Sequence, residues 1–258
     1  MSLTVITPVL NEQTFLPLFL QSVTSFADEI IIVDGGSTDS SVDIIQSFAG
    51  KHNIRLFVKK QGMAYSDEWN ESEVRNFMID EARGDWIANI DADEIFDEGL
   101  NEILPVKMKQ AAADVFLFPI VNFWRDLWTV RVNAPNDERW SNDIVRMWRN
   151  GKGIRYRDQK HHCTLRGEKG DIWTLPSERL NVPLYHCHYA LGKKIKFNDN
   201  RRGDVNLIDN SGAPDWSFRH GEYEVRTVPF SGKHPRILYP YLRIQGETDV
   251  IERQVERL

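Results

Sequence analysis

The fold is decided by the stretch Glu29-Ile30-Ile31-Ile32-Val33-Asp34-Gly35-Gly36-Ser37-Thr38-Asp39. Its continuous run of branched apolar residues is typical of a strand that is buried on both faces, as in parallel sheets covered by helices. The glycines and the hydroxyl and acidic residues that follow predict a tight turn and a helix start. We therefore expect a strand that ends at Asp34 and passes directly into a helix.

The same alternation of strand and helix extends on both sides of this stretch. Repeated β-α-β units favour a parallel sheet with right-handed crossovers and a ligand site at the carboxyl ends of its strands. Thr7, Asp34 and Asp91 all fall at such ends. The further expected elements are strands over 3–7, 54–58 and 86–90 and helices over 15–23, 42–49 and 74–82.

Two carboxylates, Asp91 and Asp93, follow the last of these strands, and Glu94 comes next. Because side chains alternate along a strand, we expect both carboxylates to point the same way. Two unpaired like charges this close repel unless a cation joins them, and a hard divalent ion is the simplest such partner. The alternative is a solvated acidic turn at the end of a strand.

Length and charge narrow the class of protein. The chain has 258 residues and a formal net charge of −6, with acidic and basic residues interspersed. This suits one large α/β domain, with or without an appended subdomain, and gives no reason to expect nucleic acid as a partner. No apolar run reaches the roughly eighteen residues of a membrane span, so we expect at most peripheral membrane contact. With only Cys163 and Cys187 and no secretory signal pattern, we expect a cytoplasmic protein.

The second half of the chain has a different pattern. Residues 115–123 and 144–148 read as strands, and Trp124, Trp128 and Trp140 lie in the segment between them. These indoles suit either a core or a platform for sugar rings. The last twenty residues favour an amphipathic helix. The predicted organisation is an α/β half at 1–125, a second half of the same domain at 126–205, and an α+β C-terminal extension at 206–258.

Three segments, in this order, resemble the family 2 glycosyltransferases of GT-A fold. They are Thr4-Val5-Ile6-Thr7-Pro8-Val9-Leu10-Asn11-Glu12, the Glu29–Asp39 stretch, and Ile90-Asp91-Ala92-Asp93-Glu94. Residues 142–149 and 183–189 further resemble the bacterial glucosyl- and heptosyl-type transferases that build lipopolysaccharide core. The resemblance implies a metal-dependent, inverting transfer of a hexose from a nucleotide-sugar donor, with a UDP-sugar favoured, to a hydroxyl of a glycan or glycolipid acceptor.

The resemblance also implies which residues bind the nucleoside. Pro8, Asn11 and Glu12 would cradle it, with the acid accepting hydrogen bonds from ribose hydroxyls. Asp34, followed by Gly35, would accept a hydrogen bond from an N–H of the base.

A second group of residues would contact the phosphates, the sugar and the metal. Arg75 and Asn76 match an Arg-Asn pair whose guanidinium reaches phosphate or sugar. Asp91 would lie against ribose or a metal-bound water, and Asp93 would bind Mn²⁺ or Mg²⁺ directly. Asp91, Asp93 and His188 are thus the candidate metal ligands, and the ion would act as a Lewis acid on the departing nucleotide.

The general base departs from the pattern that the resemblance implies. An inverting transferase needs a base within hydrogen-bond reach of the acceptor hydroxyl. Where the lipopolysaccharide branch has a His-Glu pair, this chain has His161-His162-Cys163, so the expected carboxylate is absent. We predict that His162 takes the proton, because imidazole titrates near neutral pH, with Asp143 or Asp158 as the alternative.

His186 and His188 are separated by one residue on an expected strand and should therefore face the same side. His186 is the second choice for the metal-binding histidine. An alternative joins both histidines with Cys187 and residues 161–163 in a structural zinc site, although the usual C-x₂-C or H-x₃-H spacing is absent.

Two other functions stay open. A sugar nucleotidyltransferase also uses an α/β sheet and acidic metal ligands, but its glycine-rich basic loop is poorly matched by Asn11-Glu12-Gln13. A nucleotide-sugar- or glycan-binding protein that has lost catalysis would explain the missing carboxylate. The Gly35–Ser37 turn fits neither a dinucleotide-binding nor a Walker-type loop, since both glycine spacings are absent.

Overall fold

The computed structural model describes residues 1–60, 70–124, 126–132, 143–157, 164–168, 170–190 and 226–244. His161, His162, Cys163, Asp158 and Trp140, which the sequence singles out, lie outside these ranges. So do residues 245–258, at the end of the expected terminal helix.

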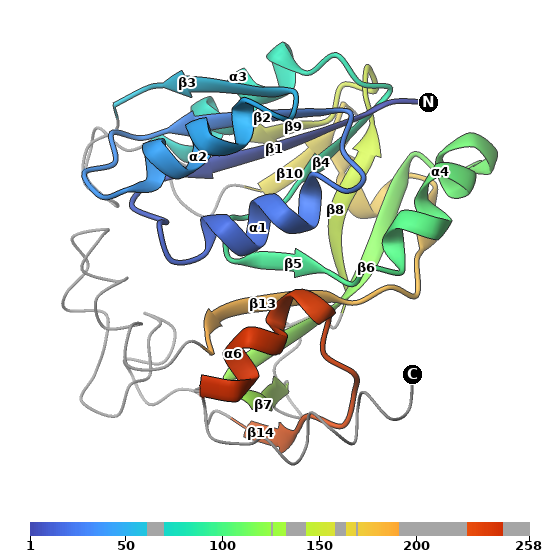
Figure 1. Cartoon of the computed structure of the whole chain (residues 1–258). Helices are drawn as coiled ribbons and strands as arrows, with labels where there is room; N and C mark the ends of the chain where they lie inside the picture. The colour runs from blue at the N-terminus through green and yellow to red at the C-terminus, as the bar shows by residue number, and fades with distance from the viewer. Residues whose placement is uncertain are drawn as a thin grey trace, which may run out of the picture.

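Four parallel strands form the first half of the fold, in the order β3-β2-β1-β4 (Figure 1). A helix follows each of the first three, so the alternation predicted from the sequence is confirmed. The elements are β1 (Leu3–Val9), α1 (Leu16–Val23), β2 (Glu29–Asp34), α2 (Ser41–Ala49), β3 (Ile54–Val58), α3 (Glu71–Glu81) and β4 (Trp86–Asn89).

Antiparallel strands extend the same sheet beyond β4. Strand β8 lies between β4 and β6 and is antiparallel to both, so residues from the second half of the chain pair directly with the first half. Strand β13 lies parallel to β6 and antiparallel to β5. The short strand β5 begins at Glu94, the last residue of the acidic motif. The strands are β5 (Glu94–Phe96), β6 (Val115–Trp124), β7 (Asp126–Val132), β8 (Asp143–Arg149), β12 (Ser177–Arg179), β13 (Leu184–Tyr189) and β14 (Arg226–Pro229).

The elements that the sequence did not predict include strand β7 and a helix, α4. The aromatic segment after β6 contains β7, which pairs with β6, and Trp124 is buried there as a core residue. Helix α4 (Leu100–Gln110) contains Pro105, a residue that normally interrupts helices and obscures their sequence pattern.

Helices and a small sheet cover the two faces of the main sheet. Strand β1 alternates, with Val5 facing α1, α2 and α4 and Ile6 facing α3. The face with Ile6 is also covered by a three-stranded sheet and a short 3₁₀ helix. These are β9 (Arg155–Arg157), β10 (Thr164–Gly167), β11 (Gly170–Asp171) and η1 (Ile172–Thr174).

A third apolar cluster lies beside β13 and β7. Here η5 (Arg236–Leu238) and α6 (Tyr239–Ile244) pack against the sheet, with Leu238 and Leu242 fully buried (Figure 1). The described start of the C-terminal helix therefore has the apolar face that its sequence predicts. Within the described ranges, no helix is long and apolar enough to cross a membrane.

We predict that Gly84→Ala destabilises the fold. A Cβ at Gly84 would lie 2.7 Å from the backbone nitrogen of Thr4 and 2.9 Å from the carbonyl oxygen of Trp86. Overpacking against buried backbone costs about 1–3 kcal/mol, so urea denaturation should show a loss of that size. The matched control is Gly50→Ala, whose Cβ would meet nothing within 4 Å. Equal stability of the two variants would contradict the prediction.

Candidate active site

The carboxyl ends of β1, β2 and β4 meet at one edge of the parallel sheet, and the predicted site residues follow them. Pro8 lies near the end of β1, Asp34 ends β2, and Asp91 comes two residues after β4. Strand β13 carries His188 alongside, because its His186 is paired with Glu94 of β5. The fold thus brings together groups that are far apart in the sequence.

Asp34 is a buried acceptor at this edge. Its Oδ1 accepts hydrogen bonds from the backbone N–H groups of Gly36 and Ser37, both at 2.9 Å. Its Oδ2 is also buried but has no hydrogen-bond partner among the described residues. Gly35 donates its N–H to the carbonyl of Val9 at 2.8 Å, which joins the β1 and β2 ends. A buried carboxylate oxygen without a partner is costly, so this atom is suited to an N–H donor of a ligand.

The loops after β1 and β2 are held together by side-chain to backbone hydrogen bonds. Asn11, at φ 55°, accepts from the N–H of Thr38 at 2.7 Å and donates its own N–H to Ser37 Oγ at 2.8 Å. The N–H of Glu12 donates to Ser41 Oγ at 2.8 Å. Asn11 tolerates the left-handed conformation better than most residues. These contacts fix the predicted nucleoside cradle, and Glu12 is 6% exposed within it.

The acidic motif forms a turn and does not continue a strand. Strand β4 ends at Asn89, and the Glu94 N–H donates to the carbonyl of Asp91 at 2.9 Å. The Glu94 carboxylate accepts in return from the Asp91 N–H at 3.1 Å. Strand alternation therefore does not apply to Asp91 and Asp93, and the premise that the two carboxylates are unpaired fails; that they bind a common cation stays a prediction. Each carboxylate has its own cationic or imidazole partners.

Asp93 faces the histidines of β13. Its Oδ2 lies 2.9 Å from His188 Nδ1 and 3.8 Å from His186 Nε2, and the two rings are stacked with centroids 6.0 Å apart. The shared side predicted for these histidines is confirmed. Burial opposes the charge of Asp93, but the imidazole of His186 and the hydrogen bond from His188 outweigh it and hold the pKa of Asp93 well below its usual range.

Arg75 does not lie on an exposed helix surface; it is buried against the acidic motif. Its Nη1 donates to Asn89 at 2.6 Å, its Nη2 to Asp91 Oδ1 at 2.9 Å, and its Nε to Glu71 at 2.8 Å. These contacts occupy the guanidinium with protein partners. Arg75 is therefore placed to orient Asp91, and the contact with phosphate or sugar expected for its guanidinium stays a prediction.

Arg146 on β8 is a site residue that sequence reasoning missed. Its Nη2 donates to Asp91 Oδ2 at 3.2 Å and also contacts Glu94 Oε1. Burial would lower the pKa of Arg146, but the charges of Glu94 and Asp91 raise it, so this guanidinium stays charged. Burial raises the pKa of Glu94, whereas for Asp91 burial is outweighed by Arg75 and Arg146, which lower its pKa. The signal in the sequence was an arginine between the apolar residues of an expected strand.

Asn76 serves the fold. Its side-chain amide donates to the carbonyl of Tyr156 at 2.8 Å and accepts from the Tyr156 N–H at 2.9 Å. This two-bond contact attaches α3 to β9 and engages both polar atoms of the side chain. The substrate contact expected for Asn76 therefore has no support in this arrangement.

Of the two predicted catalytic residues, the structure describes only Asp143. Both oxygens of its carboxylate lie within 3.0 Å of Arg179 Nε on β12. His162 lies outside the described residues.

The zinc alternative is weakened by Cys187. Its thiol is buried in the third apolar cluster, while the flanking histidines turn toward Asp93. Burial raises the pKa of the Cys187 thiol and so disfavours the thiolate that would bind zinc. The other proposed ligands, residues 161–163, are outside the described ranges.

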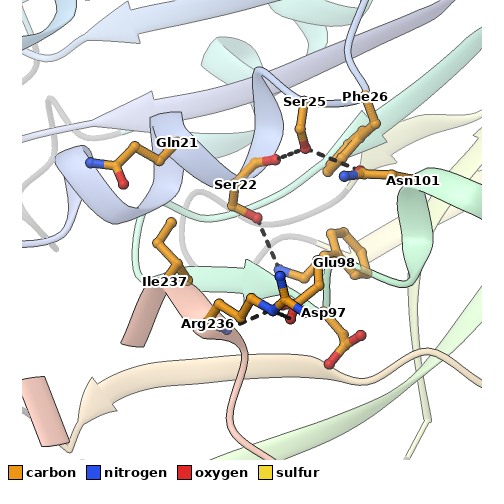
Figure 2. Close-up of a pocket in the computed structure, with 10 residues that line it drawn as sticks. Gln21, Ser22, Ser25, Phe26, Asp97, Glu98, Asn101, Arg236 and Ile237 are labelled. Carbon is orange, nitrogen blue, oxygen red and sulfur yellow. Dashed lines mark hydrogen bonds and ion pairs between the residues drawn. The ribbon is translucent and has the colours of Figure 1, made fainter. Parts of the chain in front are cut away.

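A separate pocket of about 460 Å³ lies between α1, the turn after β5, and η5 (Figure 2). Its polar groups largely bind one another: Ser25 contacts Asn101 at 3.0 Å, and the N–H of Arg236 donates to Glu98 at 3.2 Å. It contains none of the predicted site residues, so we do not assign it to the donor site.

Comparisons with known proteins identify the class of enzyme. The model of the family described as glycosyl transferase family 2 matches residues 4–164, more than half of the chain. The chain belongs to this family. Membership sets aside the sugar nucleotidyltransferase alternative.

The relatives agree with this class but are matched only in part. The lipopolysaccharide core biosynthesis glycosyltransferase LpsC of Rhizobium meliloti is 33% identical over 96 residues, which cover 37% of this chain and 33% of LpsC. Glycosyltransferase GlyG of Streptococcus pneumoniae is 29% identical over 124 residues, 47% of this chain and 40% of GlyG. The chain thus matches well under half of either relative.

Solved structures support the fold. TarS of S. aureus superposes with a TM-score of 0.52 at 16% identity, covering 72% of this chain and 36% of TarS. Its 1–349 fragment gives 0.51 at 14% identity, covering 86% of this chain and 74% of the fragment. The α/β fold is of the GT-A type, as the sequence predicted.

We predict a pH-dependent contribution of His186 to stability. Burial lowers the pKa of His186, but the negative charge of Asp93 outweighs this effect and raises the pKa above its ordinary value. A histidine whose pKa is raised in the folded state contributes its full stabilisation at pH values below its unfolded-state pKa of about 6.5. That stabilisation is lost as the pH rises through the folded-state pKa. His186→Gln should therefore reduce the free energy of unfolding more at pH 5.5 than at pH 9.

This prediction is checked by urea denaturation of both proteins at the two pH values, with chelator present to exclude metal effects. A loss that is equal at both pH values, or larger at pH 9, would contradict it.

Proposed function

We propose that this glycosyltransferase moves a hexose from a UDP-sugar to a hydroxyl of a glycan or glycolipid acceptor, with a divalent metal ion and with inversion. The observation that carries the proposal is the contact between Asp93 and His188 at the sheet edge that also holds Asp34. One face of the fold thereby offers an acceptor for a base and two ligands for a metal.

Asp34 supports a uridine nucleotide. Its partnerless Oδ2 is suited to the imide N–H of uracil, a donor that adenine and cytosine do not present on a ring nitrogen. Pro8, Asn11 and Glu12 would enclose the nucleoside, because their loop is already fixed by bonds to the loop after Asp34.

Asp93 and His188 suit Mn²⁺ or Mg²⁺. Among the residues that the structure describes, no group of three or more His, Cys, Asp and Glu side chains could hold an ion. Two protein ligands are enough where diphosphate oxygens and water complete the coordination, as is usual for Mg²⁺. The bound ion would supply a Lewis acid that neutralises charge on the leaving nucleotide. Asp91 is the weaker candidate ligand, since each of its oxygens already contacts an arginine.

For the general base we keep His162, with Asp143 as the alternative. The base would accept the proton of the acceptor hydroxyl as that oxygen attacks the anomeric carbon and the bond to the nucleotide breaks. Asp143 is disfavoured by its contact with Arg179, which engages both carboxylate oxygens. A single displacement of this kind inverts the configuration.

The proposed class of acceptor rests on the similarity of this chain to LpsC. LpsC is named for lipopolysaccharide core biosynthesis, so a lipid-linked bacterial glycan is the class we propose here. A cytoplasmic protein with at most peripheral membrane contact and no nucleic-acid partner would suit such an acceptor. A binding protein without catalysis is the competing account, and turnover decides between them.

We predict that Asp93→Asn lowers transfer by about 100-fold or more, because metal-based charge stabilisation is worth several kcal/mol and each 1.4 kcal/mol is a factor of ten. Release of UDP from UDP-glucose and other UDP-sugars, with Mn²⁺ and a glycan acceptor, measures the effect. The control is Asp43→Asn on the exposed side of α2, which should keep wild-type activity. Full turnover by Asp93→Asn with Mn²⁺ would contradict the proposed metal role.

We also predict that Asp34→Asn weakens UDP binding by about 10- to 100-fold, because a hydrogen bond to a charged group contributes about 1.5–3 kcal/mol. Titration calorimetry with UDP, GDP and dTDP in the presence of Mn²⁺ measures it. Unchanged UDP affinity in a folded variant would place the base elsewhere.

A further inference from the structure

Arg146 occupies an irregular position in β8. In the pairing with β6, Phe116 faces Met147 and Leu117 faces Val145, so Arg146 is the extra residue of a β-bulge. Val145 and Met147 consequently pack in different apolar clusters, although side chains two residues apart share a face in a regular strand. Bulges re-aim side chains and occur next to active sites. Here the bulge directs a guanidinium toward the acidic turn.

One nitrogen of Arg146 joins the two ends of that turn. Its Nη2 contacts Asp91, the first residue of the turn, at 3.2 Å and also Glu94, the last residue. The carboxylate of Glu94 is 2% exposed and bonds the Asp91 backbone with its other oxygen. Arg146 therefore closes a ring that includes both the backbone and the side chains of the turn.

Asp93 is the third residue of the same turn, and its direction depends on this ring. Its carbonyl accepts from the N–H of Cys187 at 2.8 Å, and its side chain meets His188. Arg75 contacts the turn at Asp91, whereas Arg146 contacts both Asp91 and Glu94. Without Arg146, the end of the turn next to Asp93 would keep a buried carboxylate without its guanidinium partner.

We propose that Arg146 is a positioning residue that fixes Asp93 in the direction needed to bind the metal ion of the donor complex. This inference rests on the proposed function and adds a residue to it. Arg146 itself need not touch the donor, because it acts through the shape of the turn. Groups that orient metal ligands typically contribute 10- to 100-fold to metal affinity.

The test is Mn²⁺ binding in the presence of saturating UDP, measured from the electron paramagnetic resonance signal of free Mn²⁺. Arg146→Met should weaken Mn²⁺ binding about 10-fold or more, and Arg146→Lys should recover part of the loss because it retains a charged donor. The matched control is Arg55→Met. Arg55 also bridges two carboxylates, Glu29 and Glu81, but starts from β3 and lies away from the turn.

Thermal unfolding of each variant distinguishes a loss of Asp93 positioning from a general loss of fold stability. Arg55→Met should lower the melting temperature and leave Mn²⁺ affinity unchanged. Wild-type Mn²⁺ affinity in folded Arg146→Met would overturn the inference. If Arg146→Met does not fold, Glu94→Gln is compared with Glu94→Gln/Arg146→Met, which lacks the buried charge; equal Mn²⁺ affinity of these two would also overturn it. Failure of the wild-type protein to bind UDP with Mn²⁺ would instead overturn the proposed function.

Discussion

The pairing of Asp91 and Glu94 with Arg75 and Arg146 is the constraint on which the site depends. Three carboxylates lie within four residues of chain, and a low-dielectric environment makes their mutual repulsion strong. Two guanidinium groups from α3 and β8 offset the charges of Asp91 and Glu94. This leaves Asp93, the remaining acid, to face the histidines of β13.

The mixed sheet makes this arrangement possible. Parallel strands β1, β2 and β4 bring their carboxyl ends to one edge, which explains why Asp34 and the acidic turn are neighbours. The antiparallel strand β8 then returns along β4 and brings Arg146 to the turn from a different part of the chain. Strand β13, paired with β5, adds His188. Each functional group therefore comes from a separate element, and a shift in one pairing register would separate them.

The sequence predicted what depends on local pattern. The branched apolar run before Asp34 and the periodic helices define the β-α-β half, and strand ends at a common edge predict that Asp34 and Asp91 are near each other. The shared side of His186 and His188 follows from their spacing and is confirmed by their stacked rings.

Long-range contacts could not be predicted in the same way. The partners of Asp91 include Arg146, 55 residues later, which reaches the turn only through a bulge in β8. Asn76 binds the backbone of Tyr156, 80 residues away. Its position next to Arg75 in the sequence suggested a substrate contact, but this long-range contact gives it a structural role. The direction of Asp91 relative to Asp93 depended on where β4 ends, and a difference of one residue changed the conclusion.

The central claim is that Asp93 and His188 hold the metal ion of a nucleotide-sugar complex. It is tested most directly by a crystal structure with UDP and Mn²⁺, with the manganese located by its anomalous scattering. The account predicts one strong peak bound by Asp93, His188 and the diphosphate, with the base against Asp34. UDP bound at this edge with manganese elsewhere, or with no manganese at all, would contradict it.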